Sequence, residues 1–202
     1  MKQSISKHSL NIRIKPFCIY FTTVLIVGCL CTFSAEAQEM FFIKESKIFF
    51  ESDAPLEIIK AVSTDMRGVI DPTLHTFGFS IASLSFKGFN SELQRRHFNE
   101  NYLESEKYPE ITFTGKIIDE IDFTKPGIYS VRAKGMLTIK GISHERIIRS
   151  VVEVKTNSFE LKSKFDILLD DHNIRIPRIV YQKIAPTIQI VMNAVLQLQK
   201  IQ

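Results

Sequence analysis

Cysteine is scarce in this 202-residue chain and is confined to its first part. The three cysteines, Cys18, Cys29 and Cys31, all precede residue 38. If residues 1–37 are removed, the remaining chain has no thiol for a disulfide, a nucleophile or a thiolate metal site. These three kinds of chemistry are therefore excluded for residues 38–202.

An excess of charge of one sign is also missing. Four of the 26 Lys and Arg residues and one of the 22 Asp and Glu residues fall in residues 1–37, which leaves residues 38–202 with a net charge of +1. Binding to a phosphate backbone relies on a basic surface that releases counterions. We therefore expect no nucleic-acid partner.

Motifs for catalysis and for cofactors are absent as well. The chain has no H-E-x-x-H pair and no glycine-rich phosphate loop. Asp170, Asp171 and His172 are the best candidates for a metal site, but Asp and Asn173 are also common turn formers, and we interpret residues 170–173 as a solvated turn. The sequence thus predicts a non-catalytic protein without metal or cofactor; the alternative is a hydrolase that uses His172 with Asp170 or Asp171.

The N-terminal segment is typical of a secretory signal peptide. Its basic residues end at Lys15, an apolar run covers residues 17–33, and Ala35-Glu36-Ala37 forms an A-x-A cleavage pattern. We expect cleavage after residue 37 and export of residues 38–202, as one domain, to the periplasm or the outside of the cell. Two alternatives are a retained membrane anchor and a lipoprotein tether at Cys29, since residues 26–29 resemble a lipobox.

Alternation of apolar and polar residues dominates residues 38–202 and indicates strands with one buried face. One such face in residues 129–139 consists of Tyr129, Val131, Ala133, Gly135, Leu137 and Ile139. Similar patterns occur in residues 159–169 and 188–198, and further strand candidates are residues 41–51, 56–63, 77–86, 111–121 and 147–155. About eight antiparallel strands of this kind have to close into a barrel or stack as a sandwich to hide their apolar faces.

Two segments break the alternation. Residues 90–104 are predicted to form a short helix that begins with a capping box, Ser91 and Gln94, and covers the sheet. Within the strand candidate 77–86, apolar residues change from odd to even positions after Ile81, which predicts a β-bulge there.

Two motifs resemble the YceI-like family. After Phe98, residues 102–113 match the family pattern Y-L-x-S-x-x-Y-P-x-I-x-F, and Gly135–Ile142 is similar to its glycine-leucine-threonine-isoleucine-x-glycine strand. The ending, residues 174–177 and 183–185, is similar to the family's shorter secreted variants. The Asp-x-x-His-Ser motif of many members is absent, and Phe42–Ser46 stands in its place.

The resemblance implies an all-β, lipocalin-like barrel of about eight antiparallel strands with one short helix. It also implies that an elongated apolar cavity holds a polyisoprenoid or a similar lipid. The sequence leaves open whether the protein makes transient contact with a membrane and which oligomeric state it has. A barrel of this size either holds one slender ligand or is filled by its own side chains, so a packed structural or interaction barrel remains an alternative.

The expected ligand contacts come from strands beside the helix and from the helix itself. Phe98 and Tyr102 are predicted to form an aromatic lid, with Arg96 or His97 available to an anionic head group. The full set of expected ligand-binding residues is Phe77, Phe79, Ile81, Phe86, Arg96, His97, Phe98, Tyr102, Phe113, Ile117, Leu137, Ile139 and Phe165.

Overall fold

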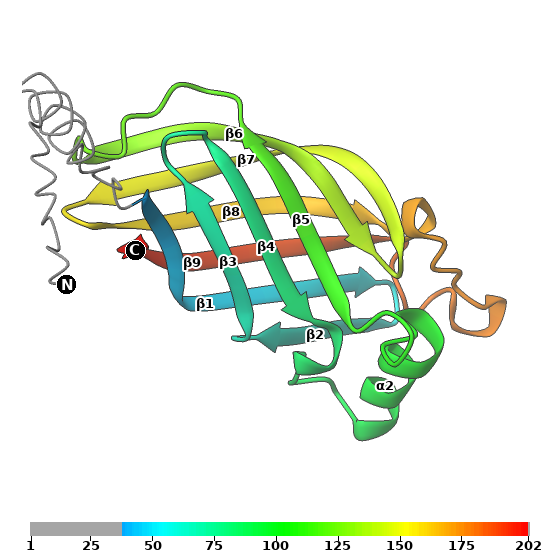
Figure 1. The fold of residues 1–202 in the computed structure, drawn as a ribbon. Coiled ribbons are helices and arrows are strands. Elements are labelled where there is room, and N and C mark those ends of the chain that lie inside the picture. The colour runs from blue at the N-terminus through cyan, green and yellow to red at the C-terminus, as the bar shows by residue number, and fades with distance from the viewer. Residues whose placement is uncertain (1–37, 202) are drawn as a thin grey trace, which may run out of the picture. The chain divides into compact units, whose positions relative to one another are not determined.

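The computed structural model describes residues 38–201, which form an all-β unit with short helical segments (Figure 1). The predicted signal peptide and the cysteines lie outside these residues. The strands are β1 (Gln38–Ala54), β2 (Glu57–Ser63), β3 (Met66–Asp71), β4 (Thr76–Ala82), β5 (Glu110–Ile117), β6 (Gly127–Ile139), β7 (Ile142–Lys155), β8 (Ser158–Leu168) and β9 (Thr187–Ile201). The helical segments are η1 (Ser83–Ser85), α2 (Glu92–His97), the π-helical turn η2 (Phe98–Tyr102), η3 (Leu169–His172) and η4 (Arg178–Val180). Within the described range, no helix is long and apolar enough to cross a membrane.

The nine strands form one antiparallel sheet that closes on itself. Their order is β2-β1-β3-β4-β5-β6-β7-β8-β9, and β1 also pairs with β9 along most of its length. Eight strands therefore close into a barrel, and β2 is an extra strand on β1. This confirms the predicted all-β, eight-stranded antiparallel barrel with one short α-helix.

The interior of the barrel is apolar because side chains alternate between the two faces of each strand. On β6, Val131 and Leu137 are buried and Lys134, between them in sequence, is exposed, as the alternation predicts. On β1 a bulge shifts the pairing with β9 between Ile43 and Glu45. The extra residue changes the inward-facing positions from odd-numbered, such as Phe41, to even-numbered, such as Phe50.

One end of the barrel is filled by aromatic and aliphatic side chains. The rings of Phe41, Phe123 and Phe159 pack on one another with centroid distances of 4.9 to 5.6 Å. Phe159 is fully buried, and the remaining cavity in this half of the barrel measures about 50 Å³. This end therefore has little room for a ligand.

The other end, where α2 lies, is wider because two strand pairs separate there. β7 and β8 pair only between their hairpin and the Ser150–Ser163 position, although both strands continue beyond it. β1 and β3 pair only at Phe41 and Phe42, and farther along β1 the partner is β2, which pairs with no other described strand and makes one bridge, between Val62 and Lys87. The strand pairing is thus incomplete at this end, where η3 contacts both β7 and β8 and where α2 lies (Figure 1).

The predicted bulge at Ile81 is wrong. β4 ends at Ala82, and Ser83–Ser85 form a turn of 3₁₀ helix instead of continuing the strand. Ser83 is buried, its N–H donates to the carbonyl of Pro109 over 2.8 Å, and its hydroxyl donates to the carbonyl of Tyr108 over 3.1 Å. After this turn the chain crosses to β2, where Lys87 bridges to Val62, so the change of apolar positions marks the end of the strand.

Candidate ligand cavity

A cavity of about 400 Å³ occupies the wide end of the barrel, beneath α2. This volume is within the range of small-molecule binding sites. Its walls come from β1, β2, β5, β6, β8, β9, the α2–η2 lid and the loop before β9. The apolar lining residues are Phe50, Ile59, Phe86, Phe89, Leu93, Phe98, Leu103, Ile111, Ile139, Ile167, Leu169, Ile174, Val180, Ile184, Ile188 and Ile190.

Four phenylalanines join the lid to the barrel wall. Phe98 stacks on Phe50 of β1 with a centroid distance of 5.3 Å and an interplanar angle of 16°. Phe86 and Phe89 pack against both rings at 5.0 to 5.8 Å. Offset aromatic contacts of this kind contribute beyond their buried area, so the cluster stabilises the lid and gives the cavity an aromatic wall.

The helical lid begins and changes type at identifiable residues. The Ser91 side chain caps α2 by accepting a hydrogen bond from the Gln94 N–H over 3.1 Å, as the capping box predicts. After His97 the helix widens into a π turn, in which the Leu103 N–H donates to the Phe98 carbonyl over 2.9 Å. Phe98 and Tyr102, at the two ends of this turn, both line the cavity. The wide turn is a feature often found at functional sites.

The YceI-like motif fixes the lid to the barrel. Leu103 and Ser105 are buried, and the Ser105 hydroxyl donates to the Asn99 side chain over 3.0 Å. The ring of Tyr108 lies against Gly141, where a side chain would collide with the ring and where φ is +73°. Only glycine suits both conditions, so this motif residue and Gly141 belong to one packing contact.

A few polar groups lie among the apolar walls. The Glu57 carboxylate accepts hydrogen bonds from Gln94 Nε2 over 3.0 Å and from Asn90 Nδ2 over 3.2 Å. The phenol of Tyr102 is protonated near neutral pH and can donate a hydrogen bond, and burial raises its pKa further above the ordinary value of 10.0. Lys183 and His97 also line the cavity. These groups could fix the head of an amphiphilic ligand.

The expected ligand-binding residues divide into groups in the structure. Phe86, His97, Phe98, Tyr102 and Ile139 line the 400 Å³ cavity. Phe77, Phe79, Phe113, Ile117 and Phe165 line the 50 Å³ cavity at the filled end.

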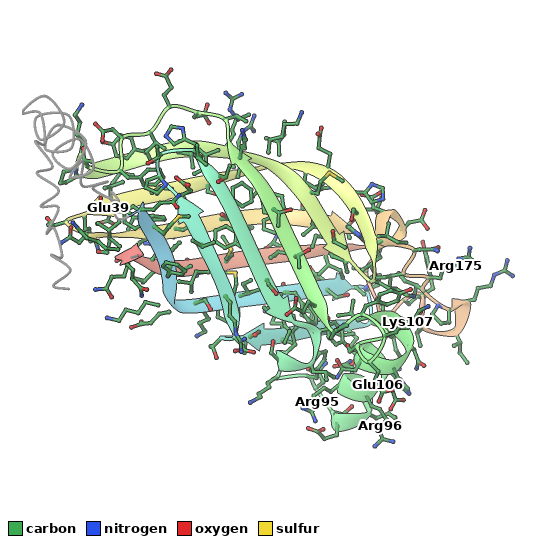
Figure 2. The ribbon with its side chains drawn as sticks, viewed as in Figure 1. Glu39, Arg95, Arg96, Glu106, Lys107 and Arg175 are labelled. Carbon is green, nitrogen blue, oxygen red and sulfur yellow. The ribbon has the colours of Figure 1, made fainter. Side chains whose placement is uncertain are left out.

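Three of the expected residues, Ile81, Leu137 and Arg96, line neither cavity. Ile81 and Leu137 are buried in the core. Arg96 is exposed on the outer side of α2 (Figure 2), where it borders a groove with Glu92, Glu100 and Lys107. The structure brings His97, Phe98 and Tyr102 of the lid together with Ile139 at the cavity, whereas Arg96 of the same lid lies outside it.

Several cavity residues were not expected from the sequence. Phe50 lies beyond the β1 bulge, where the alternation has changed phase. Ile174, Val180 and Ile184 come from the loop before β9, which has no periodic pattern. Ile188 and Ile190 are on the apolar face of β9. The alternation in residues 188–198 predicts that this face points inward, but it does not show which of its residues line the cavity.

His172 is a core residue, which corrects the interpretation of residues 170–173 as solvated. These residues do end in a turn, with Asn173 in the left-handed conformation, but His172 is only 1 % exposed. Its Nδ1 lies 3.1 Å from the Ile142 carbonyl oxygen, and loss of hydration lowers its pKa.

The arrangement around His172 gives no support to the hydrolase alternative. Asp171 pairs with Arg146 over 3.5 Å, and among residues 38–201 neither Asp170 nor Asp171 hydrogen-bonds to the His172 ring. Arg146 also donates to the Asp166 carbonyl over 2.6 Å, across the gap between β7 and β8. In the part of the chain that the structure describes, no three His, Cys, Asp or Glu side chains are arranged to hold a metal ion.

Solved structures with the same fold come from several bacteria. BcnA of Burkholderia cenocepacia is 17% identical and aligns with a TM-score of 0.62 over 74% of this chain and 95% of its own. A polyisoprenoid-binding domain of Saccharophagus degradans, implicated in plant cell wall breakdown, is 11% identical with a TM-score of 0.66 over 80% of this chain and 98% of its own. The YceI protein of Campylobacter jejuni is 19% identical with a TM-score of 0.50 over 67% and 82%. These similarities show the fold.

Two comparisons use the sequence of the chain instead of its structure. A comparison with curated proteins finds none that is similar. The family model of the YceI-like domain, however, matches residues 44–196. Because this match covers most of the chain, including the lid motif and at least part of every strand, the chain belongs to the YceI-like family.

Proposed function

We propose that the protein binds a long apolar lipid, a polyisoprenoid or a similar long-chain amphiphile, in the 400 Å³ cavity. The observation that carries this proposal is an apolar cavity at one end of a barrel whose other end is filled. The polyisoprenoid-binding domain of Saccharophagus degradans, which has the same fold, supports this class of ligand.

Burial of hydrocarbon supplies the affinity in this mechanism. Each methylene that leaves water contributes about 0.8 kcal/mol, and part of the total offsets the entropy lost on association. No acid, base or cofactor is needed, which agrees with the binding role of the polyisoprenoid-binding domain of the same fold. Selectivity then depends on the length of the cavity and on the polar groups Glu57, Tyr102 and Lys183 that line it.

Native mass spectrometry of the purified protein tests the proposal directly. We expect an adduct that dissociates on activation and has the mass of an apolar lipid. We also expect the protein to bind a fluorescent isoprenoid or fatty-acid probe. A protein that carries no adduct and takes up neither probe would contradict the proposal.

A variant that fills the cavity locates the binding site. Ile190 lines the cavity from β9, so we expect Ile190→Trp to weaken probe binding about tenfold or more, because the larger side chain occupies ligand space. Val195 is on the same strand but on its outward face, between Glu45 and Glu160 of the neighbouring strands. Val195→Trp should leave probe binding unchanged, and equal losses in both variants would place the probe outside the cavity.

We further propose that the protein is exported after cleavage of residues 1–37. The basic start, the apolar run and the A-x-A pattern support this proposal. The intact mass of the exported protein should correspond to a chain that begins at Gln38 without an acyl group. A mass that begins at a diacylated Cys29 would show a tethered lipoprotein instead.

A further inference from the structure

The loop between η3 and β9, residues 174–186, forms one side of the cavity mouth. Val180, Lys183 and Ile184 of this loop line the cavity together with Leu93 of α2. The loop lies beside α2 at the end of the barrel (Figure 1, orange). A ligand that enters at this end passes the loop.

The loop carries charge of one sign. Arg175, Arg178 and Lys183 are exposed, and the sequence has no Asp or Glu from Ile174 to its last residue. None of the three cations forms an ion pair within the described residues. Figure 2 shows Arg175 at the end of the barrel that holds α2, opposite Glu39. The mouth therefore presents unpaired positive charge on this side.

Large apolar side chains are exposed beside these cations. Ile179 is 92 % exposed and Tyr181 is 66 % exposed. Leu56, which is 66 % exposed, is next to them because its N–H donates to the Gln182 carbonyl over 2.9 Å. Leu93, on the α2 side of the mouth, is 56 % exposed.

The exposed side chains are held in place by the anchored ends of the loop. The Ala185 N–H donates to the buried Ser52 hydroxyl over 2.8 Å, and the Leu169 N–H donates to the Pro186 carbonyl over 2.9 Å. Ile174 and Ala185 are themselves buried. A loop fixed in this way keeps Ile179 and Tyr181 directed away from the core.

Apolar and aromatic side chains surrounded by cations match the interface of an anionic lipid bilayer. Aliphatic groups enter the acyl region, a tyrosine ring suits the head-group level, and Arg and Lys contact phosphates. We propose that residues 174–186 dock the cavity mouth on an anionic bilayer, with Ile179 and Tyr181 inserted and Arg175, Arg178 and Lys183 against the head groups.

This surface explains how an insoluble ligand reaches the cavity. With the mouth against the bilayer, a lipid tail passes between Leu93 and the loop without crossing water, where its exposed surface would be costly. The inference rests on the proposed lipid-binding function, and it adds the partner from which the ligand is taken or to which it is delivered.

Co-sedimentation with vesicles tests the docking surface in the purified protein. We expect binding to vesicles of phosphatidylcholine with phosphatidylglycerol, weaker binding at high salt, and at least about tenfold weaker binding to phosphatidylcholine alone. Ile179→Asp and the double variant Arg175→Glu/Arg178→Glu should each reduce binding to the anionic vesicles about tenfold or more.

Two matched controls lie elsewhere on the barrel. Ile128 is 75 % exposed at the start of β6, at the filled end, so Ile128→Asp makes the same change away from the mouth. Arg67 of β3 and Lys116 of β5 are exposed and unpaired among the described residues, so Arg67→Glu/Lys116→Glu reverses the same number of charges. Both controls should bind vesicles within about twofold of the unchanged protein.

The outcomes separate this inference from the proposed function. If the loop variants bind vesicles as the controls do, the docking surface is overturned, even where the soluble probe still binds the cavity. If Ile179→Asp instead dissociates a dimer without changing vesicle binding, the face contacts a second copy of the chain and the inference is also wrong. If the docking variants lose vesicle binding but keep probe binding in solution, the docking surface is supported.

Discussion

At the scale of single residues, His172 couples the stability of the fold to pH. Its ring is buried against the Ile142 carbonyl, and burial lowers its pKa below the ordinary value of 6.5. The unfolded chain therefore binds a proton near pH 6.5 that the folded protein does not bind. Above this value both states are neutral and the histidine has no effect, whereas stability falls as the pH decreases below it.

Urea denaturation at pH 7.5 and pH 5.5 measures this effect. One proton bound only by the unfolded state changes the free energy of unfolding by at most about 1.4 kcal/mol per pH unit. His172→Asn retains a group that can donate to the Ile142 carbonyl but cannot be charged, so its loss of stability between the two pH values should be smaller. His75, a half-buried histidine at the β3–β4 turn with φ of +54°, supplies the control His75→Asn. An unchanged pH dependence in His172→Asn would assign the effect to other groups.

At the scale of elements, most strands could be predicted from the sequence, whereas β3 (Met66–Asp71), which lies outside every strand candidate, and the irregular positions could not. The inward face of β6 is found by alternation alone because each side chain has a fixed direction relative to the next. The β1 bulge and the end of β4 interrupt this rule, and both depend on contacts between distant segments. Ser83, for example, ends β4 by bonding to Tyr108 and Pro109, which no local pattern around residue 83 reveals.

The cavity was predictable only where regular elements form it. The lid could be predicted from the capping residue Ser91 and the aromatic pair Phe98 and Tyr102, because capping and motif spacing are local features of the sequence. The loop residues Val180 and Ile184 carry no periodic signal, and their position follows from the anchoring of Ala185 to Ser52, more than a hundred residues away. Arg96 lies on the outer side because the rotation of a helix about its axis depends on packing that the sequence alone does not specify.

At the scale of the whole molecule, the barrel combines a stable half with a binding half. Strand pairing is complete around the filled end, where the Phe41, Phe123 and Phe159 rings exclude a ligand. At the other end β7 and β8 separate, and side chains such as Arg146 bridge the gap that the main chain leaves open. Strand pairing is therefore continuous at the filled end, and the end with interrupted pairing is the one that holds the cavity.

Two phenylalanines on β1 test this division of the barrel. Phe41 packs at the filled end and lines neither cavity, so Phe41→Ala should lower the free energy of unfolding by about 3 to 5 kcal/mol and leave probe affinity unchanged. Phe50 lines the ligand cavity and stacks on Phe98, so Phe50→Ala enlarges the cavity and should shift probe binding toward longer or bulkier chains. Denaturant unfolding and titration with probes of increasing chain length measure both properties in each variant. If Phe41→Ala changes the preferred chain length as much as Phe50→Ala does, the ligand reaches the filled end and the two halves of the barrel are not independent.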